Sequence, residues 1–245
     1  MRVKISLVSY LNTLPFLYGV NQSKFSNEID LQLDIPSVCA QKLLNNDVDL
    51  GLVPIAVLPQ LKEYHIISDY CIGAKEKVNS VLLLSDVPLN EIEEVYLDYQ
   101  SKTSINLIRI LAHKFWNINP IWKNTQQGYE NNISGKTAGV IIGDRTFSLD
   151  KTYKYRYDLA EEWFKFTGLP FAFACWVSNK KLPISFIKDL NEALAIGVDN
   201  IEKAMIESKT SQIAPKELLN YLTNDIDYNL DSDKRISIEL FLKYL

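Results

Sequence analysis

Cysteine and histidine are scarce in this 245-residue sequence, and their scarcity removes several kinds of site. The three cysteines, Cys39, Cys71 and Cys175, are far apart and form no Cys-x-x-Cys pair, so neither a disulfide framework nor a thiolate zinc site is predicted. The two histidines, His65 and His113, lack His-x-x-x-His spacing, which argues against a zinc or Ser-His-Asp enzyme. We expect the cysteines to be small buried residues and His113 to be solvated.

Long apolar runs and basic clusters are missing as well. No segment approaches the ~18 to 20 apolar residues of a membrane helix, and the apolar opening is shorter than a signal-peptide core of ~7 to 15 residues. With 26 Lys and Arg against 30 Asp and Glu, the net charge is −4, and the longest basic cluster is Lys180-Lys181. The sequence therefore predicts a cytoplasmic protein that binds a small organic ligand, with no nucleic acid and no membrane as partner. It makes no prediction of oligomeric state.

Phosphate-binding and calcium-binding loops are also absent. Neither G-x-x-x-x-G-K-[ST] nor G-x-G-x-x-G occurs. The segment Asp225-x-Asp227-x-Asn229 begins like a calcium loop, but Leu230 stands where glycine is needed and Ile236 where glutamate is needed. We therefore expect no metal site here.

What the sequence does contain is an alternation of strand and helix patterns. Apolar strands are predicted at about 4–8, 29–35 and 50–55, and each is followed by a helix start. A second series begins at 95–99 and includes a helix with one apolar face at 105–115. This β-α-β-α order predicts parallel sheets with right-handed crossovers.

Two fully apolar strands, 81–84 and 171–177, flank the middle of the chain. A chain that crosses from one lobe to another and returns needs two such segments. We therefore predict a two-lobe α/β fold with a ligand cleft between the lobes. Lobe 1 is expected at residues 1–86 and 176–245, and lobe 2 at residues 87–175. C-terminal helices are expected at 187–205, 215–222 and 235–244.

The first strand ends in Ser9-Tyr10-Leu11-Asn12-Thr13, just before Pro15. In open α/β sheets, ligands bind at the carboxyl ends of strands, where helix N-termini offer free N–H groups. The pattern predicts a small-molecule site. It is equally typical of an ordinary turn in which Asn12 or Thr13 caps the next helix.

Two further strand ends allow the same pair of interpretations. Ser101, Thr103 and Ser104 follow a strand and open a helix, which predicts a carboxylate or phosphate receptor, and the missing phosphate loops favour carboxylate. Serine and threonine are also common helix caps. Asp144 follows Gly143 at another strand end, where it is either a base or a cap.

Taken in order, these motifs resemble the chorismate dehydratase family, the first enzymes of the futalosine route to menaquinone. The resemblance runs from residue 3 to the end of the chain. It is carried by Ser9-Tyr10-Leu11-Asn12-Thr13, Val78-x-Ser80-Val81, Ser101-x-Thr103-Ser104, Ile142-Gly143-Asp144, Asp158-Leu159 and Thr167-Gly168-Leu169-Pro170-Phe171-x-Phe173-Ala174-x-Trp176. It implies the fold of type II periplasmic solute-binding proteins.

The resemblance also implies a reaction. Chorismate would lose water to give 3-[(1-carboxyvinyl)oxy]benzoate, without a metal or organic cofactor. Asn12 and Ser80 are the expected catalytic residues: Asn12 orients the substrate or donates to developing charge, and Ser80 holds a carboxylate or assists the leaving hydroxyl. The substrate's own side-chain carboxylate is a candidate proton acceptor. Substrate contacts are expected from Ser9, Tyr10, Thr13, Ser37, Ser101, Thr103, Ser104, Gly143 and Asp144.

Three alternatives stay open at this point. A sister enzyme of the same fold, a 1,4-dihydroxy-6-naphthoate synthase, carries a Cys-Pro-Asn-Asp type sequence where this chain has Tyr10-Leu11-Asn12-Thr13, which favours the dehydratase. A non-catalytic intracellular solute-binding protein for a small carboxylate would bind its ligand and release it unchanged. A ligand-sensing regulatory domain lacks a visible DNA-binding helix pair or basic face.

Overall fold

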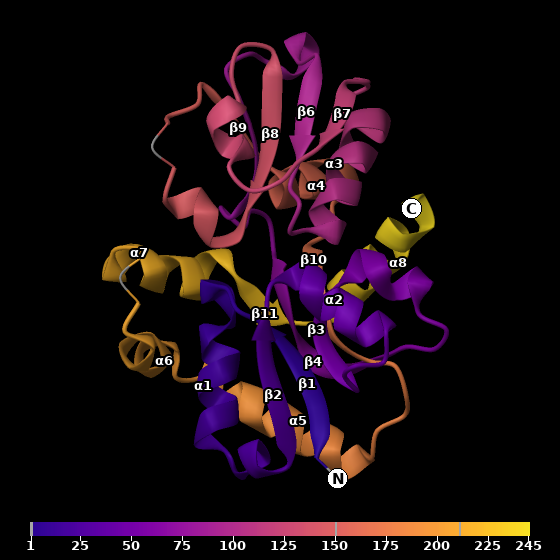
Figure 1. Cartoon of the computed structure of the whole chain (residues 1–245), viewed down its shortest axis with the longest axis vertical. Coiled ribbons are helices and arrows are strands. Elements are labelled where there is room, and N and C mark those ends of the chain that lie inside the picture. Colours follow the sequence, from indigo (N-terminus) through magenta and orange to yellow (C-terminus); the bar gives the residue numbers. More distant parts are fainter. Residues whose placement is uncertain (1, 150, 211) are drawn as a thin grey trace.

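The computed structural model describes residues 2–149, 151–210 and 212–245. It contains two β-sheets, each with its own helices, which form two parts stacked along the long axis of the molecule (Figure 1). We call the part built on the six-stranded sheet lobe 1 and the part built on the five-stranded sheet lobe 2. The two-lobe α/β architecture predicted from the sequence is confirmed.

The strands of lobe 1 come from both ends of the chain. They are β1 (Val3–Val8), β2 (Ile29–Asp34), β3 (Leu50–Pro54), β4 (His65–Ala74), β10 (Phe171–Ser178) and β11 (Asp227–Asn229), in the sheet order β11-β4-β10-β3-β1-β2. Lobe 2 contains β5 (Val81–Ser85), β6 (Glu94–Leu97), β7 (Ile121–Asn124), β8 (Thr137–Ile142) and β9 (Tyr155–Asp158), in the order β7-β6-β8-β5-β9.

The helices divide unevenly between the lobes. Lobe 1 carries α1 (Leu14–Gln22), α2 (Pro36–Leu44), α5 (Ile184–Val198), α6 (Ile201–Ser208), α7 (Pro215–Asn220) and α8 (Ser232–Tyr244), and lobe 2 carries α3 (Lys102–Lys114) and α4 (Leu159–Thr167). The helix predicted at 187–205 is two helices, α5 and α6. Within the described ranges, no helix has the length and apolar character needed to cross a membrane.

Both sheets are mixed: the predicted parallel pairing holds for the strands of the β-α-β pattern, and antiparallel strands are added to each sheet. β1 runs parallel to β2 and β3, and β6 runs parallel to β7 and β8, as the β-α-β pattern predicts. β10 is antiparallel to β3 and β4, and β5 is antiparallel to β8 and β9. Each of these two strands directly follows a segment that connects the lobes. Each therefore starts at the end of its sheet nearest the other lobe and runs antiparallel to its neighbours.

The lobe boundaries differ from those expected at residues 86 and 176. β5 pairs within the sheet of lobe 2, and β10 pairs within the sheet of lobe 1 over its whole length. Each is an inner strand with neighbours on both sides, so its apolar run reflects burial on both faces and not a crossing between lobes. The chain passes between the sheets at 75–80 and 168–170, and we propose the boundaries there.

Two glycines fix helix α1, and with it the turn that precedes it. A Cβ atom on Gly19 would lie 2.0 Å from the carbonyl oxygen of Ala193, and one on Gly197 would lie 1.7 Å from that of Pro15. Only glycine at both positions allows α1 and α5 to approach this closely. The two helices lie side by side against the sheet of lobe 1 (Figure 1).

A buried tryptophan joins the lobes on the side of α8. The indole N–H of Trp163 in α4 donates to Ser237 Oγ in α8 at 2.9 Å. The ring packs edge-on against Phe171 and Phe241, with centroids 5.3 and 6.2 Å away. Aromatic pairs of this geometry add about 0.5–1.5 kcal/mol each beyond the area that they bury. The contact links a helix of lobe 2 to a helix and a strand of lobe 1.

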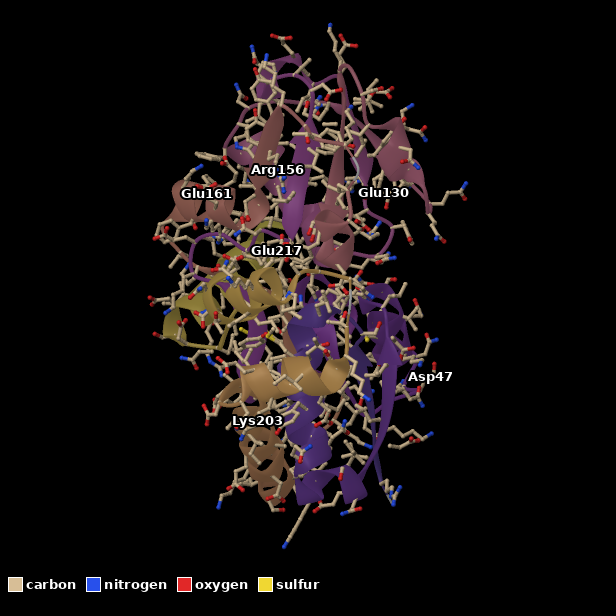
Figure 2. All side chains as sticks on the ribbon, turned by 90° about the vertical axis from the view of Figure 1, so that its left-hand side faces the viewer. Asp47, Glu130, Arg156, Glu161, Lys203 and Glu217 are labelled. Atoms are coloured by element: carbon tan, nitrogen blue, oxygen red, sulfur yellow. The ribbon has the colours of Figure 1, made fainter. Side chains whose placement is uncertain are left out.

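The surface and the cysteines follow the sequence expectations. Cys39, Cys71 and Cys175 are free buried thiols, and His113 is exposed. Figure 2 shows charged side chains pointing outward from both lobes, with Glu217 of α7 at the level where the lobes meet.

Candidate active site

A cavity lies between the two lobes, with about 530 Å³ of space when its mouth is included. Most of the lining is apolar: Val8, Pro36, Pro54, Ile72, Val78, Val81, Ile142, Gly143, Phe173 and Ala174. The polar lining residues are Tyr10, Asn12, Ser80, Ser101, Thr103 and Ser104. None of these described lining residues carries a charge, so an anionic ligand would depend on N–H and O–H donors.

Asn12 is held in a turn between β1 and α1 and is 8% exposed. Its backbone carbonyl accepts from the Tyr228 hydroxyl at 3.0 Å, and its Nδ2 donates to the Tyr221 hydroxyl at 3.4 Å. Its Oδ1 is buried and has no hydrogen-bond partner among the described residues. Thr13 is the N-cap residue of α1, one of the two positions that the capping interpretation allows, but no side chain makes a capping hydrogen bond there.

The Thr13 hydroxyl instead holds the turn together. It lies 2.5 Å from the carbonyl oxygen of Val8 and 2.7 Å from that of Tyr10, and can donate to either. Thr13 therefore does not line the cavity. A contact between Thr13 and the substrate stays a prediction. In the structure, the Thr13 hydroxyl stabilises the turn that contains Asn12.

Ser80 is fixed by hydrogen bonds to the backbone on both sides. The Asp158 carboxylate accepts from the N–H groups of Val78 and Asn79 at 2.9 and 2.6 Å, and it also caps α4. The carbonyl of Ser80 accepts from the Gly143 N–H at 2.8 Å. These bonds place the buried Ser80 hydroxyl at the cavity wall.

Tyr221 connects the two expected catalytic side chains, and sequence reasoning missed it. Its hydroxyl donates to Ser80 Oγ at 2.8 Å and accepts from Asn12 Nδ2. Tyr221 is 1% exposed and begins a single π-helical turn, Tyr221–Asp225, after α7. In the sequence it falls inside a segment that predicts only a C-terminal helix, and no local motif marks it.

Hydrogen bonds join the two lobes beside the cavity. The Tyr10 hydroxyl donates to Gln100 Oε1, and the Leu11 N–H lies 3.1 and 3.2 Å from the two carboxylate oxygens of Asp144. Burial raises the pKa of the Asp144 carboxyl to about 6. The Asp144 carboxylate thus forms a hydrogen bond between the lobes. Because Asp144 does not line the cavity, its direct contact with the substrate stays a prediction.

Gly143 is needed at this junction for two reasons. Its φ is +63°, in the left-handed region that favours glycine. A Cβ atom there would lie 2.6 Å from Cε2 of the Tyr10 ring. The tyrosine of lobe 1 therefore packs directly on the backbone of lobe 2.

The hydroxyls at the start of α3 are largely occupied. Ser101 Oγ accepts from the Ser104 N–H at 3.0 Å and donates to Ser104 Oγ at 2.8 Å, as an N-cap does. Thr103 Oγ1 donates to the carbonyl of Phe173 at 3.1 Å and accepts from the Ala56 N–H at 3.3 Å. The Ser101 side chain therefore caps the helix, as the alternative interpretation predicts, and the Thr103 side chain makes hydrogen bonds to lobe 1.

The backbone of the same helix keeps free donors. The N–H groups of Lys102 and Thr103, in the first turn of α3, have no hydrogen-bond partner in the part of the chain that the structure describes. Since the N-terminus of a helix also carries partial positive charge, these groups are suited to a carboxylate.

A second helix of lobe 1 begins at the cavity. Pro36 occupies the first turn of α2 and lines the cavity, and the next residue, Ser37, is half-buried. Ser9 is exposed, and its N–H donates to the carbonyl of Asp34 at 2.9 Å. Neither Ser37 nor Ser9 lines the cavity, so their substrate contacts stay predictions.

A charged network lies behind Tyr10. The fully buried Asp98 accepts from the Arg145 guanidinium, and it also accepts from the N–H groups of Gln100 and Ile142 at 2.9 and 3.0 Å. It thereby positions the glutamine that Tyr10 contacts. Over residues 2–149, 151–210 and 212–245, no group of three or more His, Cys, Asp or Glu is arranged to hold a metal ion.

Comparisons with solved structures support the fold. A protein from Archaeoglobus fulgidus has a TM-score of 0.74 at 12% identity, over 99% of this chain and 96% of that chain. A Candida albicans protein described as having the generic periplasmic binding protein fold has a TM-score of 0.66 at 11% identity, over 99% and 89%. The periplasmic aliphatic sulphonate binding protein of Escherichia coli has a TM-score of 0.61 at 14% identity, over 99% and 85%. The fold is therefore periplasmic-binding-protein-like, as expected.

Sequence comparisons identify the family. A curated chorismate dehydratase from Thermus thermophilus is 26% identical in an alignment 232 residues long, which covers 86% of this chain and 84% of the relative. A family model described as menaquinone biosynthesis matches residues 3–245. The chain, with its cavity between two lobes, therefore belongs to this family of menaquinone biosynthesis proteins.

Proposed function

We propose that the protein is a chorismate dehydratase, a hydro-lyase of menaquinone biosynthesis that acts in the cytoplasm on the futalosine route. The family match and the curated relative support this assignment. The observation that supports it in the structure is the buried Asn12 Oδ1, which has no partner among the described residues and shares with Ser80 a cavity that is lined mostly by apolar residues. The naphthoate synthase and the solute-binding alternatives are not favoured.

The reaction removes water from the ring of chorismate. The C3 proton is vinylogous to the ring carboxylate, so its loss gives an anion that is delocalised into that carboxylate. The C4–O bond then breaks, the ring becomes aromatic, and the departing hydroxyl takes up a proton to leave as water. The product is 3-[(1-carboxyvinyl)oxy]benzoate. No oxidant or reductant is needed for the balance.

The polar groups of the cavity match the substrate at the leaving hydroxyl. Chorismate at neutral pH has two carboxylates and an ether oxygen, all acceptors, and the C4 hydroxyl is its only donor. Asn12 Oδ1 is the buried acceptor without a partner among the described residues of the cavity, so it is assigned to that donor. The Ser80 hydroxyl then donates to the C4 oxygen as negative charge develops on it.

The carboxylates of the substrate are assigned to the two helix starts. The free N–H groups of Lys102 and Thr103 at α3 receive one carboxylate, and the first turn of α2 at Ser37 receives the other. A charge-assisted hydrogen bond of this kind contributes about 1.5–3 kcal/mol. The side-chain carboxylate of the substrate is a candidate to accept the C3 proton.

Closure of the lobes has a chemical role in this proposal. The Tyr10 contact with Gln100 and the Leu11 contact with Asp144 hold the mouth closed. Closure excludes water from the anion and fixes the substrate near the reacting groups. Ser9, Tyr10, Thr13, Gly143 and Asp144 therefore support the site by shaping the turn and the closed mouth.

The purified protein should convert chorismate to the benzoate product, as followed by liquid chromatography with mass detection. Recovery of unchanged chorismate would leave only a binding protein. Asn12→Ala should lower kcat by roughly 10²–10³, with a small change in KM. Asn21→Ala, at an exposed position of α1, is the matched control and should keep wild-type kcat. A loss of stability without a loss of kcat would remove Asn12 from the mechanism.

A further inference from the structure

Among the described residues, Tyr221 is the side chain that hydrogen-bonds both residues assigned to the leaving hydroxyl. Its hydroxyl lies 3.4 Å from Asn12 Nδ2 and 2.8 Å from Ser80 Oγ. The three residues come from the first turn of lobe 1, the passage into lobe 2 and the segment after α7. The bonds therefore cross the cleft as well as large separations in the sequence.

The chemistry of the three groups gives this chain of hydrogen bonds one direction. The amide Nδ2 of Asn12 can only donate, so the Tyr221 oxygen is the acceptor of that bond. The single phenolic proton of Tyr221 is then used on Ser80 Oγ. As a result, the proton of Ser80 is not needed for Tyr221 and is free to point at a ligand, and the Oδ1 of Asn12 is left as an acceptor.

The surroundings of Tyr221 keep it neutral and in place. Burial raises the pKa of its hydroxyl well above the ordinary range, so the group stays protonated and does not act as a base. The Phe147 ring packs edge-on against the tyrosine ring, with centroids 4.9 Å apart. The π-helical turn that Tyr221 begins is a rare feature that occurs often at functional sites.

We propose that Tyr221 is a positioning residue for the dehydration, which turns the Ser80 proton and the free Asn12 carbonyl toward the leaving C4 hydroxyl. This proposal rests on the proposed function. Tyr221 contacts Ser80 and Asn12 and is not itself placed on the substrate. Without its hydroxyl, the Ser80 hydroxyl is free to rotate, and the Asn12 amide is free to flip.

The test is Tyr221→Phe, which removes only the hydroxyl. We expect kcat for chorismate to fall roughly tenfold to 100-fold, as misplacement of reacting groups produces, while KM stays within about twofold. Tyr153→Phe is the matched control, because Tyr153 is also buried and its hydroxyl bonds the Glu130 carbonyl at 3.2 Å, away from the cavity. It should keep wild-type kcat at a similar cost in melting temperature.

A double-mutant cycle separates positioning from general stability. In a Ser80→Ala background, Tyr221→Phe should lower kcat by a smaller factor than it does in the wild-type background, because one of the two groups that it directs is already gone. Full additivity of the two effects, or a Tyr221→Phe enzyme with the kcat of Tyr153→Phe, would overturn the proposal. Should Tyr221→Phe not fold, Phe147→Leu keeps the hydroxyl but loosens the ring. It should lower kcat severalfold at constant KM, and an unchanged kcat would overturn the proposal.

The outcome for the wild-type protein is read first. If the wild-type chain does not dehydrate chorismate, the proposed function fails and the role of Tyr221 fails with it. If the wild-type chain is active and Tyr221→Phe matches its control, only the role of Tyr221 fails.

Discussion

Gly143→Ala tests whether the contact between Tyr10 and Gly143 holds the lobes closed. The added Cβ atom would lie 2.6 Å from the tyrosine ring, where ordinary contacts begin near 3.4 Å, so the ring must shift by about 0.8 Å. That shift takes the Tyr10 hydroxyl away from Gln100 Oε1. A hydrogen bond of this kind contributes about 0.5–1.5 kcal/mol net.

The backbone strain of the substitution can be measured separately. Gly143 has φ +63°, and an alanine in the left-handed region costs about 1–2 kcal/mol. Gly135 has φ +58° in lobe 2, and no atom lies within 4 Å of a Cβ built there. Gly135→Ala therefore carries the same strain without the collision, which makes it the matched control.

Gly143→Ala and Gly135→Ala should lose similar amounts of stability from backbone strain but should differ in KM for chorismate. Gly143→Ala should raise KM for chorismate roughly 2- to 10-fold relative to Gly135→Ala, because substrate binding then has to supply the lost closure energy. Urea unfolding gives the stability of both variants, and initial rates of product formation give kcat and KM. Equal values of kcat/KM in the two variants would refute the view that this contact holds the cleft closed.

Two further predictions concern neighbouring side chains. Since burial raises the Asp144 pKa from 3.8 to about 6, the native state binds more protons than the unfolded chain between these values, and this group's contribution to stability falls as the pH rises through that window. Asp144→Asn keeps an acceptor for the Leu11 N–H. In urea unfolding this variant should be more stable than wild type at pH 7.5, by at most about 3 kcal/mol. The gain in stability should shrink toward pH 4, and a gain independent of pH would contradict the reasoning. Thr103→Val should lower the free energy of unfolding by about 1–3 kcal/mol, because the Ala56 N–H and the Phe173 carbonyl lose a buried partner. An unchanged urea midpoint would show that the Thr103 hydroxyl does not stabilise the fold.

The sequence by itself determined the features that depend on local patterns. The period-two segments at 29–34 and the apolar run at 50–54 became strands β2 and β3, and the capping pattern at Ser101 became the start of α3. Polar residues at strand ends predicted a small-molecule site, and Asn12, Thr103 and Ser104 do line one cavity, as does Ser80, which the family resemblance supplied. Such predictions work because backbone periodicity and capping depend on residues only a few positions apart.

Tertiary structure alone decided which distant groups meet. The apolar runs of β5 and β10 do not reveal which sheet each joins, because an inner strand of either sheet has the same composition. Tyr221 reaches Ser80 across 141 positions, and Asp144 reaches the Leu11 N–H across 133. Hydrogen-bond partners at such separations depend on how the two lobes pack together, and that packing is a property of the whole fold and not of any local pattern.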